Sequence, residues 1–217
     1  MSDKSIVINQ IDNLSKYFFK YSLINKSNNI NCKDDKVGNI IKFNILNYIS
    51  IYTELVDNKK YHIMLNDNSL ICFYYQFDKN EKIIKHCLYY FPSPSEDIYS
   101  LFQSKVYNSL NELEVKTVVE LSQLLEKYIR IDYDLEGKKE IVHTSVHLHY
   151  GLTSDKLRIP IYSKVYPEEF VYFILKYVYE SDDKNLESLN LNVSKNAELS
   201  ELELQRFYLQ NTLNAKI

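Results

Sequence analysis

Two consecutive segments, residues 69–77 and 82–91, alternate apolar and polar side chains, and this alternation most limits how the chain can fold. A period of two is typical of a β-strand, in which successive side chains point to opposite faces of a sheet. The apolar positions are Ile71, Phe73, Tyr75 and Phe77 in the first segment and Ile84, Leu88 and Tyr90 in the second. We therefore expect two strands here.

Short polar turns join these strands to their neighbours in the sequence. Residues 66–68, Asn-Asp-Asn, separate an apolar segment at 61–65 from the first alternating segment. Residues 78–81 separate the two alternating segments, and Pro92 and Pro94 end the second one, because proline cannot donate a hydrogen bond to a strand ladder. The pattern predicts an antiparallel meander.

Other segments place apolar residues three and four positions apart, which is the spacing of an amphipathic helix. We expect helices at residues 5–23, 96–104, 110–127, 167–179 and 201–214. The ambiguous segment 39–56 favours a helix over a strand. Residues 25–38 are polar and predict a loop, and residues 157–163 predict an edge strand because they contain Pro160. The expected fold class is α+β, an antiparallel meander sheet flanked by helices.

The composition of the chain changes near residue 180. Residues 1–180 are expected to form a single α+β domain. The connector that follows reads DDKNLESLNLNVSKN and is polar, and Ser200 and Glu203 have the spacing of a capping box at the start of a further helix. We therefore expect residues 181–217 to form a C-terminal helical extension, which could contact the domain or a protein partner.

Charge and cysteine content limit the expected cellular compartment and binding partners of the protein. The 26 basic and 29 acidic residues leave a formal net charge of −3, which gives no global attraction to nucleic acid. Cys32, Cys72 and Cys87 are odd in number and lack CxxC spacing, which argues against a disulfide framework. No apolar run is long enough to span a membrane, and the first residues do not resemble a secretory signal. We expect a cytoplasmic protein that does not contact a membrane.

The stretch 128–151 carries the strongest candidate for a functional site. Two alternating segments flank a polar turn there, and three of the chain's five histidines lie within seven residues. Each segment has one apolar face and one face that carries charge or imidazole. The polar positions are Arg130, Asp132 and Asp134 on the first segment and His143, Ser145, His147 and His149 on the second.

The loop of this hairpin decides which of these residues face one another. A two-residue loop at 136–137 places Arg130 opposite His143. A four-residue loop at 136–139 places Asp132 there instead, and in both cases the other two histidines lie further along the strand. Either loop puts the Arg and Asp residues on the histidines' side of the sheet. The hydrophobic pattern enforces this parity, because a slip by one residue would bury the charges.

Several motifs in fixed order resemble those of a bacterial domain family of unknown function. They are LNDNSLI (LxDxSLI), LYYFPSP (LxYFPSP), RIDYD (RxDYD), HLHYG and RIP, and the resemblance covers about residues 43–180. It implies a recurrent domain without an established activity. In this family pattern a glycine is usual where the chain has Asn68, and asparagine is the best substitute at positive φ. The pattern also has Gln and Arg in place of Cys72 and Cys87, which leaves open whether those changes affect activity.

Two kinds of chemistry fit the polar face, and the sequence leaves both open. His147 and His149 have a spacing that is found in transition-metal sites, and Asp132 or Asp134 could complete such a ligand set. The sequence does not identify the metal or any other cofactor. Without a metal, the two histidines would act as general acid and base while Arg130 stabilises charge on a transferring phosphoryl group. The structural alternative is an ordinary polar sheet face held by an Arg130–Asp132 ion pair.

The leading hypothesis is a nuclease-like effector that cleaves phosphodiester bonds of RNA or DNA in a bacterial toxin or phage-defence system. Small bacterial toxins that carry an Arg-x-Asp element followed by a His-x-His element show a fainter resemblance to the chain. The catalytic residues would be Arg130, Asp132, His147 and His149.

The alternative is a non-catalytic subunit of a defence complex. It would bind nucleic acid or a protein partner through the tyrosine-rich sheet, where Tyr74, Tyr89 and Tyr90 would stack bases or fill a groove of the partner. The C-terminal helix favours a protein partner. An open, concave polar cluster would favour the enzyme, whereas a polar face covered by the domain's own helices would favour the interaction module.

Overall fold

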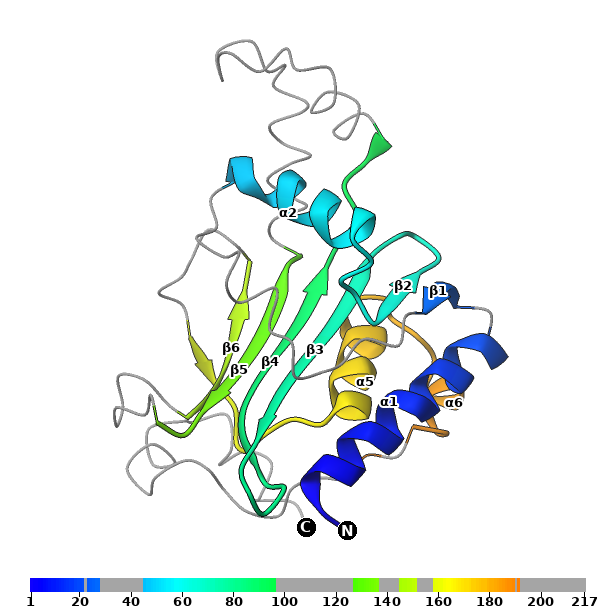
Figure 1. Ribbon diagram of the computed structural model, residues 1–217. Coiled ribbons are helices and arrows are strands. Elements are labelled where there is room, and N and C mark those ends of the chain that lie inside the picture. Colours follow the sequence, from blue (N-terminus) through cyan, green and yellow to red (C-terminus); the bar gives the residue numbers. More distant parts are fainter. Residues whose placement is uncertain are drawn as a thin grey trace, which may run out of the picture.

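The described residues form a seven-stranded antiparallel sheet, and its strands follow one another in sequence order (Figure 1). The computed structural model describes residues 1–21, 23–27, 45–96, 127–136, 145–151, 158–189 and 191. The strands are β1 (Ile24–Ser27), β2 (Ile63–Leu65), β3 (Leu70–Phe77), β4 (Ile83–Phe91), β5 (Ile129–Asp134), β6 (Val146–Tyr150) and β7 (Ile159–Pro160). The predicted meander is confirmed.

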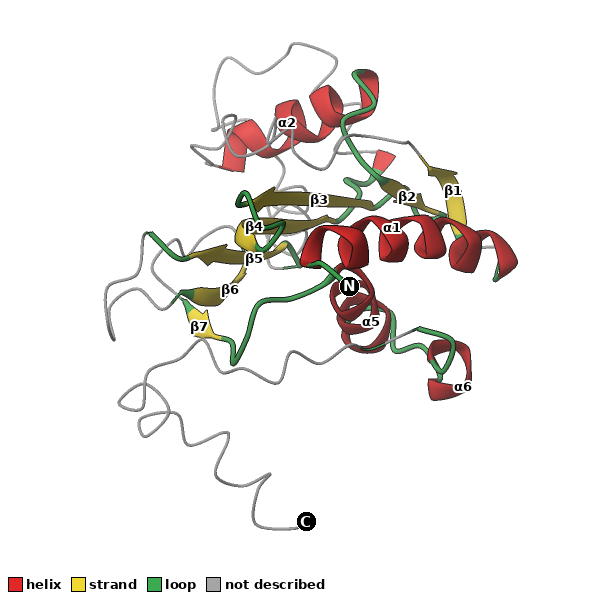
Figure 2. Ribbon diagram, turned by 60° about the horizontal axis from the view of Figure 1, so that its bottom comes forward, coloured by secondary structure: helices red, strands yellow, loops and turns green. Residues whose placement is uncertain are grey.

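Helices lie on both faces of this sheet, which confirms the α+β class. They are α1 (Asp3–Lys20), α2 (Ile45–Asp57), α5 (Pro167–Tyr177) and the single turn α6 (Asp183–Leu186). Ser2 caps α1, because its hydroxyl accepts a hydrogen bond from the Ser5 N–H. Pro167 begins α5, where its missing N–H leaves no helical hydrogen bond unmade. Figure 2 shows α1 and α5 on one face and α2 on the other.

The first core lies between the sheet and the pair α1 and α5. Its sheet residues occupy every second position of the strands, as the alternation predicts, and they include Ile71, Phe73 and Tyr75 on β3. Phe73 and Phe170 of α5 meet edge to face, with ring centroids 6.4 Å apart. Burial of these large apolar side chains is the main contribution to the stability of the fold.

The second core lies on the opposite face, between α2 and one end of β2, β3 and β4. It contains Tyr48, Tyr52 and Leu55 of α2 together with apolar residues of the three strands. The Tyr48 hydroxyl donates to the Pro92 carbonyl, so the buried phenol is satisfied. The polar positions of β5 and β6 lie on this same face of the sheet, because Cys87 of the second core pairs directly with a polar position of β5.

Most local predictions agree with the described residues. The turn between β2 and β3 contains Asn68 with φ of 65°, as expected for a residue that substitutes for glycine. Proline-containing β7 is an edge strand beside β6. The loop predicted for 25–38 is wrong for residues 25–27, which belong to β1 and pair with β2. Backbone hydrogen bonds hold this edge strand, and they form whether the side chains are polar or apolar, so the polar sequence did not indicate a strand.

Other predictions lie outside the described residues. These are the helix expected at 201–214, the helices expected at 96–104 and 110–127 apart from their described residues 96 and 127, and the part of the 25–38 loop that follows residue 27. Leu186 and Leu189 pack in the first core, and the boundary proposed at residue 180 stays a prediction. None of the described helices combines the length and the apolar character that a membrane span requires.

Asp3 ties the start of α1 to two distant segments. Its carboxylate accepts hydrogen bonds from the Ile83 N–H at 3.0 Å, from Lys164 Nζ at 2.8 Å and from the Tyr166 hydroxyl at 2.8 Å. Burial raises the pKa of Asp3, but the bonds from Lys164 and the other donors outweigh it and lower the pKa overall. This carboxylate therefore fastens α1 to β4 and to the segment that leads into α5.

His86 is a core residue. It lies on β4 between Tyr75 of β3 and Tyr133 of β5, and its side chain is fully buried. The Val165 N–H donates to Nε2 at 3.0 Å, which assigns the ring proton of a neutral imidazole to Nδ1. Burial lowers the pKa of His86 to about 3.

We predict that Asp3→Ala destabilises the protein by about 2–3 kcal/mol, because three donors lose a charged acceptor. Asp12→Ala is the matched control, since Asp12 is an exposed carboxylate on the same helix. Urea unfolding of both variants measures the difference. Equal stabilities would show that the Asp3 contacts contribute nothing.

We also predict that His86 makes stability depend on pH. The unfolded state takes up a proton near the ordinary pKa of 6.5, whereas the folded state stays neutral down to about 3. His86 therefore contributes stability that is present above pH 6.5 and is lost as the pH falls through that window, by about 2 kcal/mol at pH 5.

The comparison with His86→Gln isolates this contribution. Glu169 has the opposite effect in the same range, because burial raises its pKa to about 7. The stability advantage of the wild type over His86→Gln, measured by urea unfolding, should shrink by about 2 kcal/mol between pH 7 and pH 5. A constant difference across that range would contradict the assignment.

Candidate functional site

The hairpin of β5 and β6 brings the predicted polar residues together, but in a different register from the one expected. Arg130 pairs with His149, and Asp132 pairs with His147. The parity argument is confirmed, since even positions of β5 face odd positions of β6. Both predicted short loops are wrong, because the ladder continues to the hydrogen bond from the Asp134 N–H to the Ser145 carbonyl.

The connection between the two strands is thus about ten residues long, at 135–144. Positions 137–144 lie outside the described residues, and with them His143, which both predicted loops had placed opposite β5. The turn letters Glu136-Gly137 fit a tight hairpin, but a shift by an even number of residues keeps every side chain on its own face, so the apolar pattern permits the observed register equally well. In the observed register His147 and His149 lie directly opposite the Arg and Asp residues.

Local alternation on β5 explains how the site is held. Ile129, Ile131 and Tyr133 are buried in or beside the first core, and the residues between them are only partly buried. The apolar residues cannot leave their face without exposing large side chains, so the polar ones are held on the other face.

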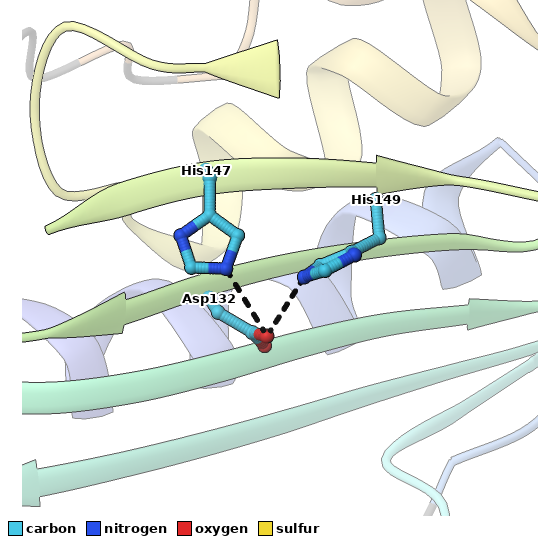
Figure 3. Close-up of side chains that lie close together, drawn as sticks. All are labelled: Asp132, His147 and His149. Carbon is cyan, nitrogen blue, oxygen red and sulfur yellow. Dashed lines mark ion pairs between the residues drawn. The ribbon is translucent and has the colours of Figure 1, made fainter. Parts of the chain in front are cut away.

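The cluster converges on one carboxylate oxygen, Oδ2 of Asp132 (Figure 3). Arg130 Nε lies 2.9 Å from it, His149 Nε2 lies 3.4 Å from it and His147 Nε2 lies 3.8 Å from it. The two imidazole rings meet edge to face with centroids 4.8 Å apart. All four predicted site residues therefore lie in one cluster, and their roles remain a prediction.

The two imidazoles are buried, whereas the two charged residues reach solvent. The side chain of His147 is 2% exposed and that of His149 is 4% exposed, against 19% for both Arg130 and Asp132. The cluster therefore has a closed inner side formed by the histidines and a partly open outer side formed by the ion pair.

Asp132 is ionised in spite of its burial. Burial raises the pKa of the carboxyl group, but the contacts with His149, Arg130 and His147 outweigh it and lower the pKa to about 2. Within the described part of the chain, Oδ1 of Asp132 and Nε2 of His149 have no hydrogen-bond partner. The carboxylate thus retains acceptor capacity.

Residues of β4 complete the surroundings, and the sequence did not indicate them. Cys87 pairs with Asp132, and Tyr89 pairs with Arg130. The long connection between β4 and β5 sets no register that a sequence pattern can reveal, so only the structure shows which β4 residues border the site. Cys72 is a buried thiol on the same face, and burial raises its pKa, which disfavours the reactive thiolate.

Other aromatic and charged residues lie near the site without joining it. Tyr89 and Tyr90 are each 2% exposed, so the expectation that they stack bases on an open sheet face is wrong. Tyr90 instead lies in the first core, where its hydroxyl is bonded to Tyr179. Arg158 is exposed just before β7. Asp134 pairs with Lys85 at 3.2 Å and does not join the cluster at Asp132.

We predict that Arg130 and Asp132 stabilise each other. A double-mutant cycle with Arg130→Met and Asp132→Asn should give a coupling energy of about 1–3 kcal/mol, because both partners are largely withdrawn from water. The control cycle, Lys85→Met with Asp134→Asn, tests an ion pair on the same sheet face whose side chains are 39% and 30% exposed. It should give less than about 1 kcal/mol. Equal coupling energies from urea unfolding would contradict this prediction.

Comparison with known proteins identifies the family of the chain. No curated protein and no solved structure is significantly similar to it. One family model matches residues 14–211, a wider region than the one covered by the motifs of the sequence analysis. The match covers most of the chain and both strands of the polar hairpin. The chain therefore belongs to the family described as uncharacterized conserved protein (DUF2290).

Proposed function

We propose that the chain is a phosphodiesterase that cleaves RNA or DNA, with Arg130, Asp132, His147 and His149 as its catalytic residues. The observation that carries the proposal is the convergence of two imidazoles and a guanidinium on Asp132 Oδ2, at 2.9–3.8 Å. Buried sites in which imidazole, carboxylate and guanidinium meet are suited to moving protons and to stabilising anions.

Arg130 is the residue that fits a phosphate group. A guanidinium presents several N–H donors in one plane and binds two phosphate oxygens at once. Arg130 contacts Asp132 through Nε, and a substrate phosphate would be bound by the terminal nitrogens of the same guanidinium. The side chain of Arg130 is partly exposed, which gives a substrate access to it.

The histidines fit the activation of a nucleophile better than a divided acid and base role. General acid and base catalysis of phosphodiester cleavage requires one group at the attacking oxygen and another at the leaving oxygen, on opposite sides of the phosphorus. His147 and His149 approach the same carboxylate oxygen and lie side by side. Both therefore lie on one side of a phosphate held by Arg130.

The biological setting that suits this activity is a bacterial toxin or phage-defence system. This part of the proposal rests on the resemblance to a bacterial family and on the toxin-like order of the Arg-x-Asp and His-x-His elements. The protein would act as the effector that cuts nucleic acid.

Two observations favour the second candidate, a non-catalytic interaction module. Both histidines are almost fully buried, as in an internal polar network. Exposed apolar residues also gather near the β7 edge: Tyr150 is 49%, Ile159 38% and Tyr162 39% exposed. Edge strands with exposed apolar side chains readily pair with another chain. The protein would then bind a partner there and catalyse nothing.

Cleavage of labelled single-stranded and double-stranded RNA and DNA by the purified full chain tests the first proposal. Arg130→Gln and His147→Gln should each reduce the cleavage rate at least about a hundredfold, since each removes a group that acts in the transition state. Lys16→Gln is the matched control for the loss of one positive charge, because Lys16 is exposed on α1, away from the site. It should cleave at the wild-type rate.

Circular dichroism and thermal unfolding establish that each variant is folded. No cleavage of any substrate by the wild type, or unchanged rates in both folded site variants, would overturn the enzymatic proposal. That result would favour the interaction module.

A further inference from the structure

We propose that Asp132, His147 and His149 bind a divalent transition-metal ion, and that Zn²⁺ is the ion their donor atoms fit best. The inference uses the same site as the proposed function and deepens it, because the ion would be the group that activates the nucleophile. Metal binding is nevertheless measured without reference to cleavage.

The spacing of the donor atoms carries the inference. Nitrogen and oxygen ligands lie about 2.0–2.1 Å from Zn²⁺, so two ligands of a tetrahedral site lie about 3.4 Å apart. The distances from Asp132 Oδ2 to Nε2 of His149 and of His147 are 3.4 Å and 3.8 Å, and all three donor atoms lie within 4.8 Å of one another. These separations exceed those of a charge-assisted hydrogen bond, about 2.7–2.9 Å.

Burial supplies a second, independent argument. The side chain of His149 is 4% exposed, and its Nε2 atom has no hydrogen-bond partner in the described part of the chain. A buried polar atom without a partner is destabilising. Figure 3 shows that this atom points toward Asp132 Oδ2, and an ion between the two would satisfy both.

The donor set indicates the class of ion. Two imidazole nitrogens and one carboxylate oxygen suit Zn²⁺ and its neighbours in the first transition series. Mg²⁺ and Ca²⁺ prefer oxygen ligands and are not expected to bind here. The two histidines are neighbours on one face of β6, and Asp132 is the direct partner of His147 on β5, so the rigid ladder sets the ligand geometry.

Arg130 would remain as the outer partner of the carboxylate. It contacts Oδ2 at 2.9 Å, while Oδ1 has no hydrogen-bond partner among the described residues. The guanidinium can move to Oδ1 and leave Oδ2 to the ion, as outer groups commonly orient metal-bound carboxylates. The charges of Arg130 and Asp132 cancel, so the charge of the ion would attract an anionic group, such as a phosphodiester oxygen, to the open position.

Titration of the chelator-treated full chain with Zn²⁺ tests the inference. Calorimetry and elemental analysis should give one Zn²⁺ per chain, with at least a hundredfold weaker binding in Asp132→Asn and in His149→Gln. His62→Gln is the matched control, because it removes a buried histidine outside the cluster, and it should bind like the wild type. The same titration with Mg²⁺ should show no binding.

X-ray absorption of the Zn²⁺-loaded wild type gives an answer that does not depend on whether the variants fold. Two imidazoles and one carboxylate around the ion would support the inference. No stoichiometric Zn²⁺ in the wild type, a coordination shell without two imidazoles, or unchanged binding in the site variants would overturn it.

The outcome for the metal and the outcome for cleavage are separable. Stoichiometric Zn²⁺ at these ligands without cleavage of nucleic acid would sustain the metal site and reject the phosphodiesterase. If a chain that binds no Zn²⁺ still cleaves nucleic acid in excess chelator, the phosphodiesterase is sustained and the metal site is rejected.

Discussion

Burial of the sheet on both faces is the constraint on which the rest of the structure depends. With α1 and α5 on one face and α2 on the other, the strands in the middle of the sheet have little access to solvent. A polar side chain there must find a partner of its own, because an unpaired buried charge is strongly destabilising. Asp132 satisfies this requirement through Arg130 and two histidines. The partners that neutralise the buried carboxylate are therefore the same groups that form the candidate site.

Much of the fold follows from local patterns in the sequence. Alternation predicts β3, β4 and β5, the Asn-Asp-Asn turn predicts the hairpin before β3, and Pro167 predicts the start of α5. β1 could not be predicted in the same way, because an edge strand is held by backbone hydrogen bonds that any sequence can make. The position of Asp3 at the junction of three segments is also invisible in the sequence, since its partners lie about 80 and 160 positions away.

The candidate site shows the same division at a finer scale. Parity is a property of each strand, so the shared face of Arg130, Asp132, His147 and His149 could be predicted from alternation alone. Register is a property of the pair of strands, and the register predicted from the turn residues at 136–139 was wrong by several residues. Cys87 and Tyr89 could not be predicted to border the site, because a long connection separates β4 from β5 and leaves their alignment to tertiary packing.

The pairing of Asp132 with His147 makes the fold and the site separately vulnerable to insertions. A shift of β6 by two residues keeps every apolar side chain on its own face, so the cores would persist. The same shift moves each histidine by about 7 Å along the sheet, so Asp132 would face His149 or Ser145 in place of His147. Two residues added within β6 would thus preserve the cores and change which side chains face Asp132.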